Sequence, residues 1–302
     1  MQRFLAGYGE LGQGISFRSY LPDAQTLTAY YPPMSKSPLM NATTARIFCH
    51  FIYVLGPSIS IFERHAPNPA MVFSSGAGSR APQNVWTYTI PMLALSHPPL
   101  QHAILAVSSL HIAKLTKGSN NASRLHYSLA IKRLGKALSD DRKRRHVATL
   151  AATLLLAYFE TMSAEHEKWT THIVGAKQLL REIDFDNVSK RIEALDDEER
   201  ANEQFPQQPA STHAVARNQR LMMRAARKQR DAFPLHTVDE NLRNYIMGTK
   251  VAQRRESNAQ AKVRAKITTK KDLETCQLQS DLFWWFAKMD VYQAILSGAG
   301  LV

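Results

Sequence analysis

The chain has 302 residues, 44% of them hydrophobic and 21% charged, which predicts a folded protein with a substantial core. Its formal net charge of +13 and pI near 9.8 favour acidic partners such as nucleic acid or acidic protein segments. Two cysteines, Cys49 and Cys276, argue against a disulfide framework and a cysteine-based zinc site, and we expect both to be buried thiols.

The N-terminal part predicts an irregular leader followed by one helix. Residues 1–40 are rich in glycine, serine and proline, which disfavour regular structure. From Thr43, apolar residues recur at spacings of three and four and predict a helix that Gly56-Pro57 ends. These residues are Ile47, Phe48, Phe51, Ile52 and Leu55. Residues 65–91 contain four prolines and predict a surface loop, with Trp86 and Tyr88 holding its far end to the core.

Four consecutive helices are predicted next. The first opens at His97-Pro98-Pro99, because proline suits the first turn of a helix. Ser123 is predicted to cap the second, whose apolar positions are Tyr127, Ile131, Leu134 and Leu138. After a charged loop over 140–146, residues 147–163 are apolar almost all round and predict a central helix. The fourth runs from about Trp169 to Glu182, and the short loops predict an antiparallel stack.

The last third divides into a charged insert and an aromatic helix. Residues 186–271 are expected to be partly disordered; within them, 201–271 carry 15 Lys and Arg against 5 Asp and Glu. Residues 272–302 predict a helix that continues the domain of residues 41–185, and we expect that domain to extend past Val302. Its apolar positions are Leu282, Trp285, Phe286, Met289, Tyr292 and Leu296. Because no strand pattern occurs, the predicted fold class is all-α.

No membrane segment is predicted either. The longest apolar stretch, Leu150 to Met162, is shorter than the roughly 20 residues that cross a bilayer. Glycines interrupt the first 14 residues, which therefore lack the apolar core of a signal peptide. We expect no membrane partner.

The sequence contains no catalytic motif, so we expect no enzyme and assign no catalytic, cofactor-binding or metal-ligating residues. His166 and His172 are six residues apart, whereas a zinc-protease helix needs two histidines four apart, so polar residues at a helix start are the better interpretation. Lone histidines such as His97, His102, His111 and His126 are interpreted as surface or satisfied core groups. The Trp284-Trp285-Phe286 cluster indicates core rather than a ligand pocket.

Two basic clusters are candidate binding sites. The run Arg142, Lys143, Arg144 and Arg145 indicates either a nuclear-import signal or a solvated loop between helices. A second set recurs at helical spacing and would contact either phosphates or the acidic run 193–199. Its members are Arg217, Arg220, Arg224, Arg227 and Lys228.

Several stretches together resemble the fungal-specific transcription factor domain, the regulatory region of six-cysteine binuclear zinc-cluster factors. They are Trp86–Pro91, Leu93–Leu100, His102–His111, Leu154–Glu160, Trp169 with His172 and Gly175-Ala176, and Asp281–Trp285 with Asp290–Tyr292. Gly7-Tyr8-Gly9 resembles a short motif that often follows such a zinc cluster.

The resemblance implies a helical, nuclear transcriptional regulator that controls RNA polymerase II transcription and has no catalytic residues. The zinc cluster needs six cysteines, so we expect no cofactor in this chain, with zinc only in full-length relatives. DNA would then be contacted only through an N-terminal module missing from these residues, and the partners would be other transcription proteins. A homodimer is an open alternative, as is a non-catalytic helical scaffold or dominant-negative regulator without DNA binding.

Overall fold

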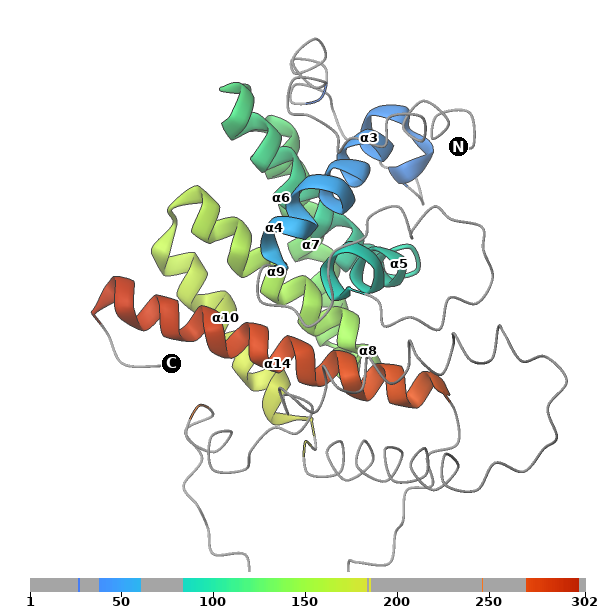
Figure 1. Cartoon of the computed structure of the whole chain (residues 1–302), viewed down its shortest axis with the longest axis vertical. Coiled ribbons are helices and arrows are strands. Elements are labelled where there is room, and N and C mark those ends of the chain that lie inside the picture. Colours follow the sequence, from blue (N-terminus) through green and yellow to red (C-terminus); the bar gives the residue numbers. More distant parts are fainter. Residues whose placement is uncertain are drawn as a thin grey trace, which may run out of the picture. The chain divides into compact units, whose positions relative to one another are not determined.

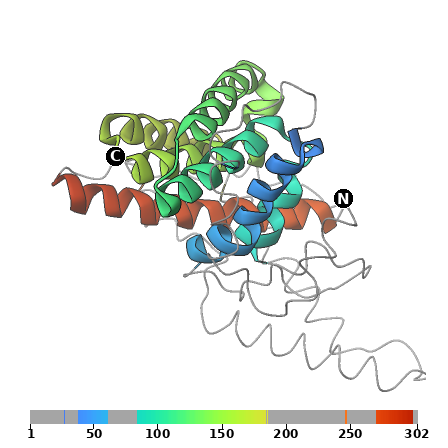
Figure 2. The same cartoon turned by 90° about the horizontal axis from the view of Figure 1, so that it is seen from above.

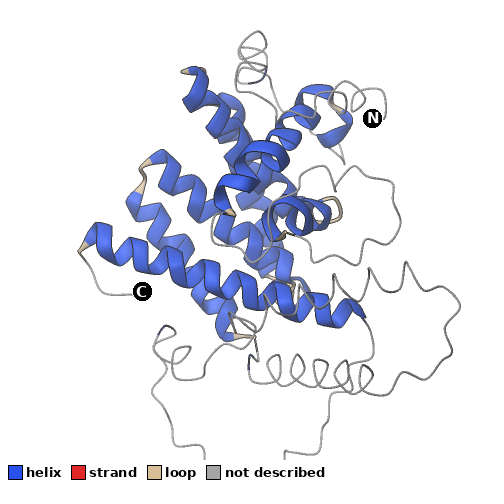
Figure 3. Ribbon diagram, in the orientation of Figure 1, coloured by secondary structure: helices blue, strands red, loops and turns tan. Residues whose placement is uncertain are grey.

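The structure is a computed structural model that describes residues 38–60, 84–183 and 270–298, together with Leu27, Phe185 and Ile246. The chain divides into two compact units, Met1–Ala176 and Lys177–Val302. All regular structure in the described ranges is helical, with no strand among them (Figure 3). The predicted all-α class is confirmed. The leader over 1–40, apart from Leu27 and the 3₁₀ turn η2 (Pro38–Met40), lies outside the described residues, and so does nearly all of the insert.

The first unit is built on helices α6 (Pro98–Thr116), α7 (Asn121–Leu138) and α9 (Val147–Ser163). Each of these helices packs against the other two, and Figures 1 and 2 show them side by side. Because four residues join α6 to α7, the two helices form an antiparallel pair. Helix α10 (His166–Arg181) begins in the same unit, where Trp169, Ile173 and Ala176 are buried. The predicted stack of four helices is confirmed.

Helix α9 is the centre of this unit. Its bounds agree with the predicted 147–163, and its buried residues occupy every side of the helix from Val147 to Ala157. Thr149 and Thr153 are buried as well; the Thr153 hydroxyl donates to the Thr149 carbonyl at 2.9 Å, so its polar group is satisfied within the helix.

Helix α7 presents a different face to the core from the predicted one. Its buried residues are mostly small: Ala122, Ser123, His126, Ala130, Leu134 and Ala137. Ile131 is 37% exposed, so the predicted stripe is wrong at that position. Ser123 is not the cap either, because the helix begins two residues earlier and the Ser123 hydroxyl donates to the Asn120 carbonyl at 2.8 Å. Small side chains let α6 and α7 approach closely. The face of α7 that carries small residues is therefore the buried one, and not the face that carries the larger residues.

Two helical segments that pack together contain the same irregularity. Helix α3 (Ala42–His50) continues through a π-helical turn, η3 (Phe51–Leu55), into α4 (Gly56–Ile59). Likewise the π-helical turn η5 (Val85–Thr89) runs into α5 (Ile90–Ala94). In both, a proline follows the wide turn by two residues, and η3 and α4 pack against η5. Figures 1 and 2 show α3 beside α6, in agreement with their contacts.

These segments correct two predictions. Gly56-Pro57 does not end the first helix, and residues 85–91 are helical instead of forming a loop; residues 61–83 lie outside the described ranges. A proline lacks the amide hydrogen of a helical bond, and its ring clashes with the carbonyl four residues earlier. A wide turn before each proline changes the bonding from four residues back to five. Trp86 is 1% exposed, as predicted, whereas Tyr88 is half-buried.

The second unit contains the aromatic helix α14 (Lys270–Ser297). Phe283 and Phe286 are fully buried, and the Phe283 ring lies 5.2 Å from that of Phe185. Trp285 is 5% exposed and Trp284 is half-buried, so the prediction that the cluster is core is confirmed for Trp285 and Phe286. The predicted stripe is wrong at Tyr292, which is 45% exposed, and the side chain of Leu296 is not among those described.

Candidate functional site

Histidines form two pairs around helix α6. The His50 Nε2 and His111 Nδ1 atoms are 2.8 Å apart, and the His102 and His126 Nδ1 atoms are 3.0 Å apart. Burial is the largest cause that lowers the pKa of His50 and His126 to about 3 and of His102 to about 4; burial also lowers the pKa of His111. All four rings are therefore neutral at physiological pH, and each pair shares one N–H hydrogen bond.

The remaining histidines of interest are less buried. The rings of His97 and His146 lie 4.1 Å apart, and the His97 Nδ1 lies 2.8 Å from the Leu93 carbonyl. His166 begins α10, and its side chain is not described. The interpretation of His97, His102, His111 and His126 as surface or core groups therefore agrees with the structure.

A second polar centre joins three helices of the first unit. The Tyr127 hydroxyl on α7 lies 3.0 Å from Nε2 of His172 on α10, and its ring stacks on Phe159 of α9 at 4.7 Å. Glu160 is 2% exposed, and burial raises its pKa. Burial and a hydrogen bond to Glu160 raise the pKa of Tyr127, which stays protonated and donates. A tyrosine with a raised pKa is a poor nucleophile, so this centre is suited to holding helices together.

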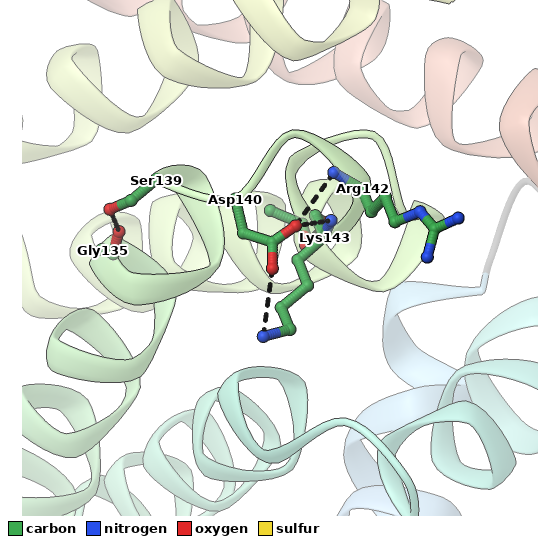
Figure 4. Close-up of polar contacts among 6 residues, drawn as sticks. Gly135, Ser139, Asp140, Arg142 and Lys143 are labelled. Carbon is green, nitrogen blue, oxygen red and sulfur yellow. Dashed lines mark hydrogen bonds and ion pairs between the residues drawn. The ribbon is translucent and has the colours of Figure 1, made fainter.

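The basic run Arg142–Arg145 forms a short helix and not the predicted loop. It lies on α8 (Asp141–Arg144), whose preceding residue, Asp140, accepts hydrogen bonds from the backbone amides of Arg142 and Lys143 at 3.0 and 3.2 Å (Figure 4). Asp140 also forms an ion pair with the Lys143 ammonium at 3.2 Å. The second pair joins Arg144 to Asp141 at 3.0 Å. Arg142, Lys143 and Arg145 remain exposed.

The outer face of α7 is basic as well. Arg124, Ser128, Lys132 and Lys136 are all exposed and follow one another at intervals of four residues, which places them on one side of the helix. We call these four residues the α7 basic surface. Sequence reasoning missed it, although the signal was available: residues 121–138 include no Asp or Glu. The other predicted basic set, Arg217 to Lys228, lies outside the described residues.

The described residues contain neither a metal-binding cluster nor a membrane-spanning helix. Within residues 38–60, 84–183 and 270–298, no three His, Cys, Asp or Glu side chains gather in a way that would hold a metal ion. Nor does any helix in the described part of the chain have the length and apolar character needed to span a bilayer. Cys49 and Cys276 are both buried and free, as predicted, and burial raises the pKa of Cys49 to about 11.

Comparison with known proteins gives one family and one relative. The sequence profile described as "Fungal specific transcription factor domain" matches residues 46–212, more than half of the chain. The chain is also 28% identical, over 120 residues, to Sterol uptake control protein 2 of Candida albicans. That similarity covers 36% of this chain and 17% of the relative, so the chain spans a small part of it. No solved structure matches.

Proposed function

Because the chain belongs to the family of fungal specific transcription factor domains, we propose that it is the helical regulatory region of a factor controlling RNA polymerase II transcription in the nucleus. The observation that carries the proposal is the extent of the family match. Residues 46–212 include α6, α7, α9 and all of α10, which are the helices that make the stack of the first unit. The family match therefore covers the long helices of the first unit, whereas α14 lies outside it.

Contact with DNA would come from a separate zinc-cluster module. Such a cluster needs six cysteines, and these 302 residues include two, both buried in helices. The helical region would then act through proteins, receiving a partner on the exposed faces of the stack. Its partners would be other transcription proteins, and no cofactor is assigned to it.

A tethering experiment tests this proposal. The chain is fused to an unrelated DNA-binding domain, and transcription of a reporter carrying that domain's sites is measured against the DNA-binding domain alone. We expect the fusion to raise or lower the transcript reproducibly. An unchanged transcript, with the fusion folded, nuclear and present at the same level, would reject regulation in favour of a scaffold that does not act in transcription.

Import is tested separately with a fluorescent fusion of the full chain. If Arg142–Arg145 direct import, replacing all four by alanine moves the fluorescence from the nucleus to the cytoplasm. The matched control replaces Arg124, Lys132 and Lys136, which are also exposed and basic, by alanine and should leave import unchanged. Equal loss in both variants, or in neither, would show that this run is not the signal.

A further inference from the structure

We propose that the α7 basic surface is a docking site for an acidic, amphipathic helix of a partner protein. Such docking needs only the folded first unit and does not depend on a role in transcription. Arg124, Lys132 and Lys136 are the cations on this side of α7, and Ser128 occupies the turn between Arg124 and Lys132. Each step of four residues advances about 6 Å along the helix, which matches the spacing of carboxylates placed four apart on a second helix.

The charges on this surface are available to a partner. Among the described residues, Arg124, Lys132 and Lys136 form no ion pair with a carboxylate. Helix α7 has no acidic residue of its own between 121 and 138. An exposed stripe of one sign of charge attracts an oppositely charged segment and sets its orientation.

One edge of the same face offers an apolar contact. Ile131 is 37% exposed and follows Arg124 by seven residues, two turns along the helix, and Gly135 lies one turn further on. A Cβ atom added at Gly135 would meet nothing within 4 Å, so the space above this glycine is open to a partner side chain. A partner helix with an apolar residue among its carboxylates would place that residue here.

Nucleic acid fits this surface less well. A phosphate backbone is continuous, and along α7 it would meet the carboxylate of Asp140, which is paired with Lys143 (Figure 4), and that of Asp141, which is paired with Arg144. A protein segment can end before that point. Aromatic side chains that stack on bases are also missing from the exposed residues of α7, because the Tyr127 ring is stacked on Phe159.

Fluorescence anisotropy with a labelled helical peptide of about 18 residues tests the proposal. The peptide carries Glu at every fourth position and a central Leu, and its control carries Gln in place of Glu. The full chain should bind the Glu peptide and not the Gln peptide, with affinity falling as salt rises. The combined variant Lys132→Glu with Lys136→Glu should weaken binding about tenfold, since an exposed ion pair changes an affinity by up to about fivefold.

The matched control is Lys114→Glu with Lys117→Glu. Both lysines are exposed at the end of α6, and the two variants change the net charge equally. The control should weaken binding less than about threefold at physiological salt, where charges more than about 8 Å away are screened. Ser128→Glu, which puts one negative charge within the stripe, should also weaken binding of the Glu peptide. It replaces the α7 variant as the test if that variant does not fold. Circular dichroism checks folding in every case.

Three results would overturn the proposal. The first is equal weakening by the α7 variant and the α6 control, which would mean that only net charge matters. Absence of binding to the Glu peptide at low salt is the second. The third is a short duplex DNA that binds more tightly than the peptide and is weakened by the α7 variant alone, which would make the surface a nucleic-acid site.

Discussion

Two glycines in helices should respond oppositely to the same substitution. Gly56 and Gly135 both have right-handed helical backbones, so alanine gains helix propensity of up to about 1 kcal/mol at either position. The two positions differ in the space available to an added methyl group. At Gly135 the new methyl group meets nothing within 4 Å. At Gly56 it would lie 3.0 Å from the Phe51 carbonyl oxygen, 3.1 Å from that of Trp86 and 3.2 Å from Thr87 Cγ2.

Two of the three atoms near Gly56 belong to the backbone of packed π-helical turns, which cannot move aside as a flexible side chain can. Forcing an extra methyl group into such a site costs about 1–3 kcal/mol. We therefore expect Gly56→Ala to lower the free energy of unfolding by up to about 2 kcal/mol after the propensity gain, and Gly135→Ala to raise it by about 0.5 kcal/mol.

Urea unfolding followed by far-ultraviolet circular dichroism measures both changes against the unaltered chain. Gly56→Ala should shift the midpoint to lower urea and Gly135→Ala to higher urea, with similar slopes. If Gly56→Ala were as stable as Gly135→Ala, the close approach of η3 and α4 to η5 would be refuted.

Three further predictions concern buried polar groups. Folding lowers the pKa of His50 and of His126 from 6.5 to about 3, so the unfolded chain binds protons that the folded chain does not. As the pH falls from about 6.5 towards 3, each histidine should lower the free energy of unfolding by up to about 1.4 kcal/mol per pH unit. Urea unfolding at pH 7 and pH 5 measures this loss, and equal stability at the two pH values would contradict it. Tyr127→Phe should lower the free energy of unfolding by about 1–3 kcal/mol, because the buried Glu160 carboxyl loses a hydrogen-bond donor. A decrease of less than about 0.5 kcal/mol would contradict a stabilising role for this polar centre. Cys49, with a pKa of about 11, should react with iodoacetamide at pH 8 only in urea, and rapid labelling of the native chain would show that the thiol is accessible.

The regular helices were predictable because their apolar content leaves one interpretation. Residues 147–163 are apolar almost all round, and the structure places that helix at the same bounds. His97-Pro98-Pro99 similarly marked the start of α6, because proline fits a first turn. In both cases local preference and burial agree, which is the condition under which a sequence pattern is reliable.

The errors occurred where tertiary packing overrides a local rule. Gly56-Pro57 and Ile90-Pro91 normally interrupt a helix, but a π-helical turn before each proline lets the helix continue. On α7, a face of small residues packs against α6, and Ile131 is left at the surface. Periodicity counts large apolar residues and does not register the close approach that Ala122, Ala130 and Ala137 permit.

Of the exposed basic residues on α7 and α8, only the contiguous run was predicted from the sequence. Arg142–Arg145 form a contiguous run and were found at once, whereas Arg124, Lys132 and Lys136 are spread over thirteen residues and look like an ordinary solvated face. Their alignment depends on which side of α7 is buried, and that side was misassigned. The absence of acidic residues from the helix was the remaining signal.

The central claim is that this helical chain regulates transcription, and rapid depletion tests it most directly. The chain is given an inducible degradation tag in the cell that encodes it, and nascent transcripts are sequenced within minutes of depletion. We expect a defined set of RNA polymerase II genes to change together before growth changes. Unchanged nascent transcription, with the chain nearly all removed, would contradict a regulatory role.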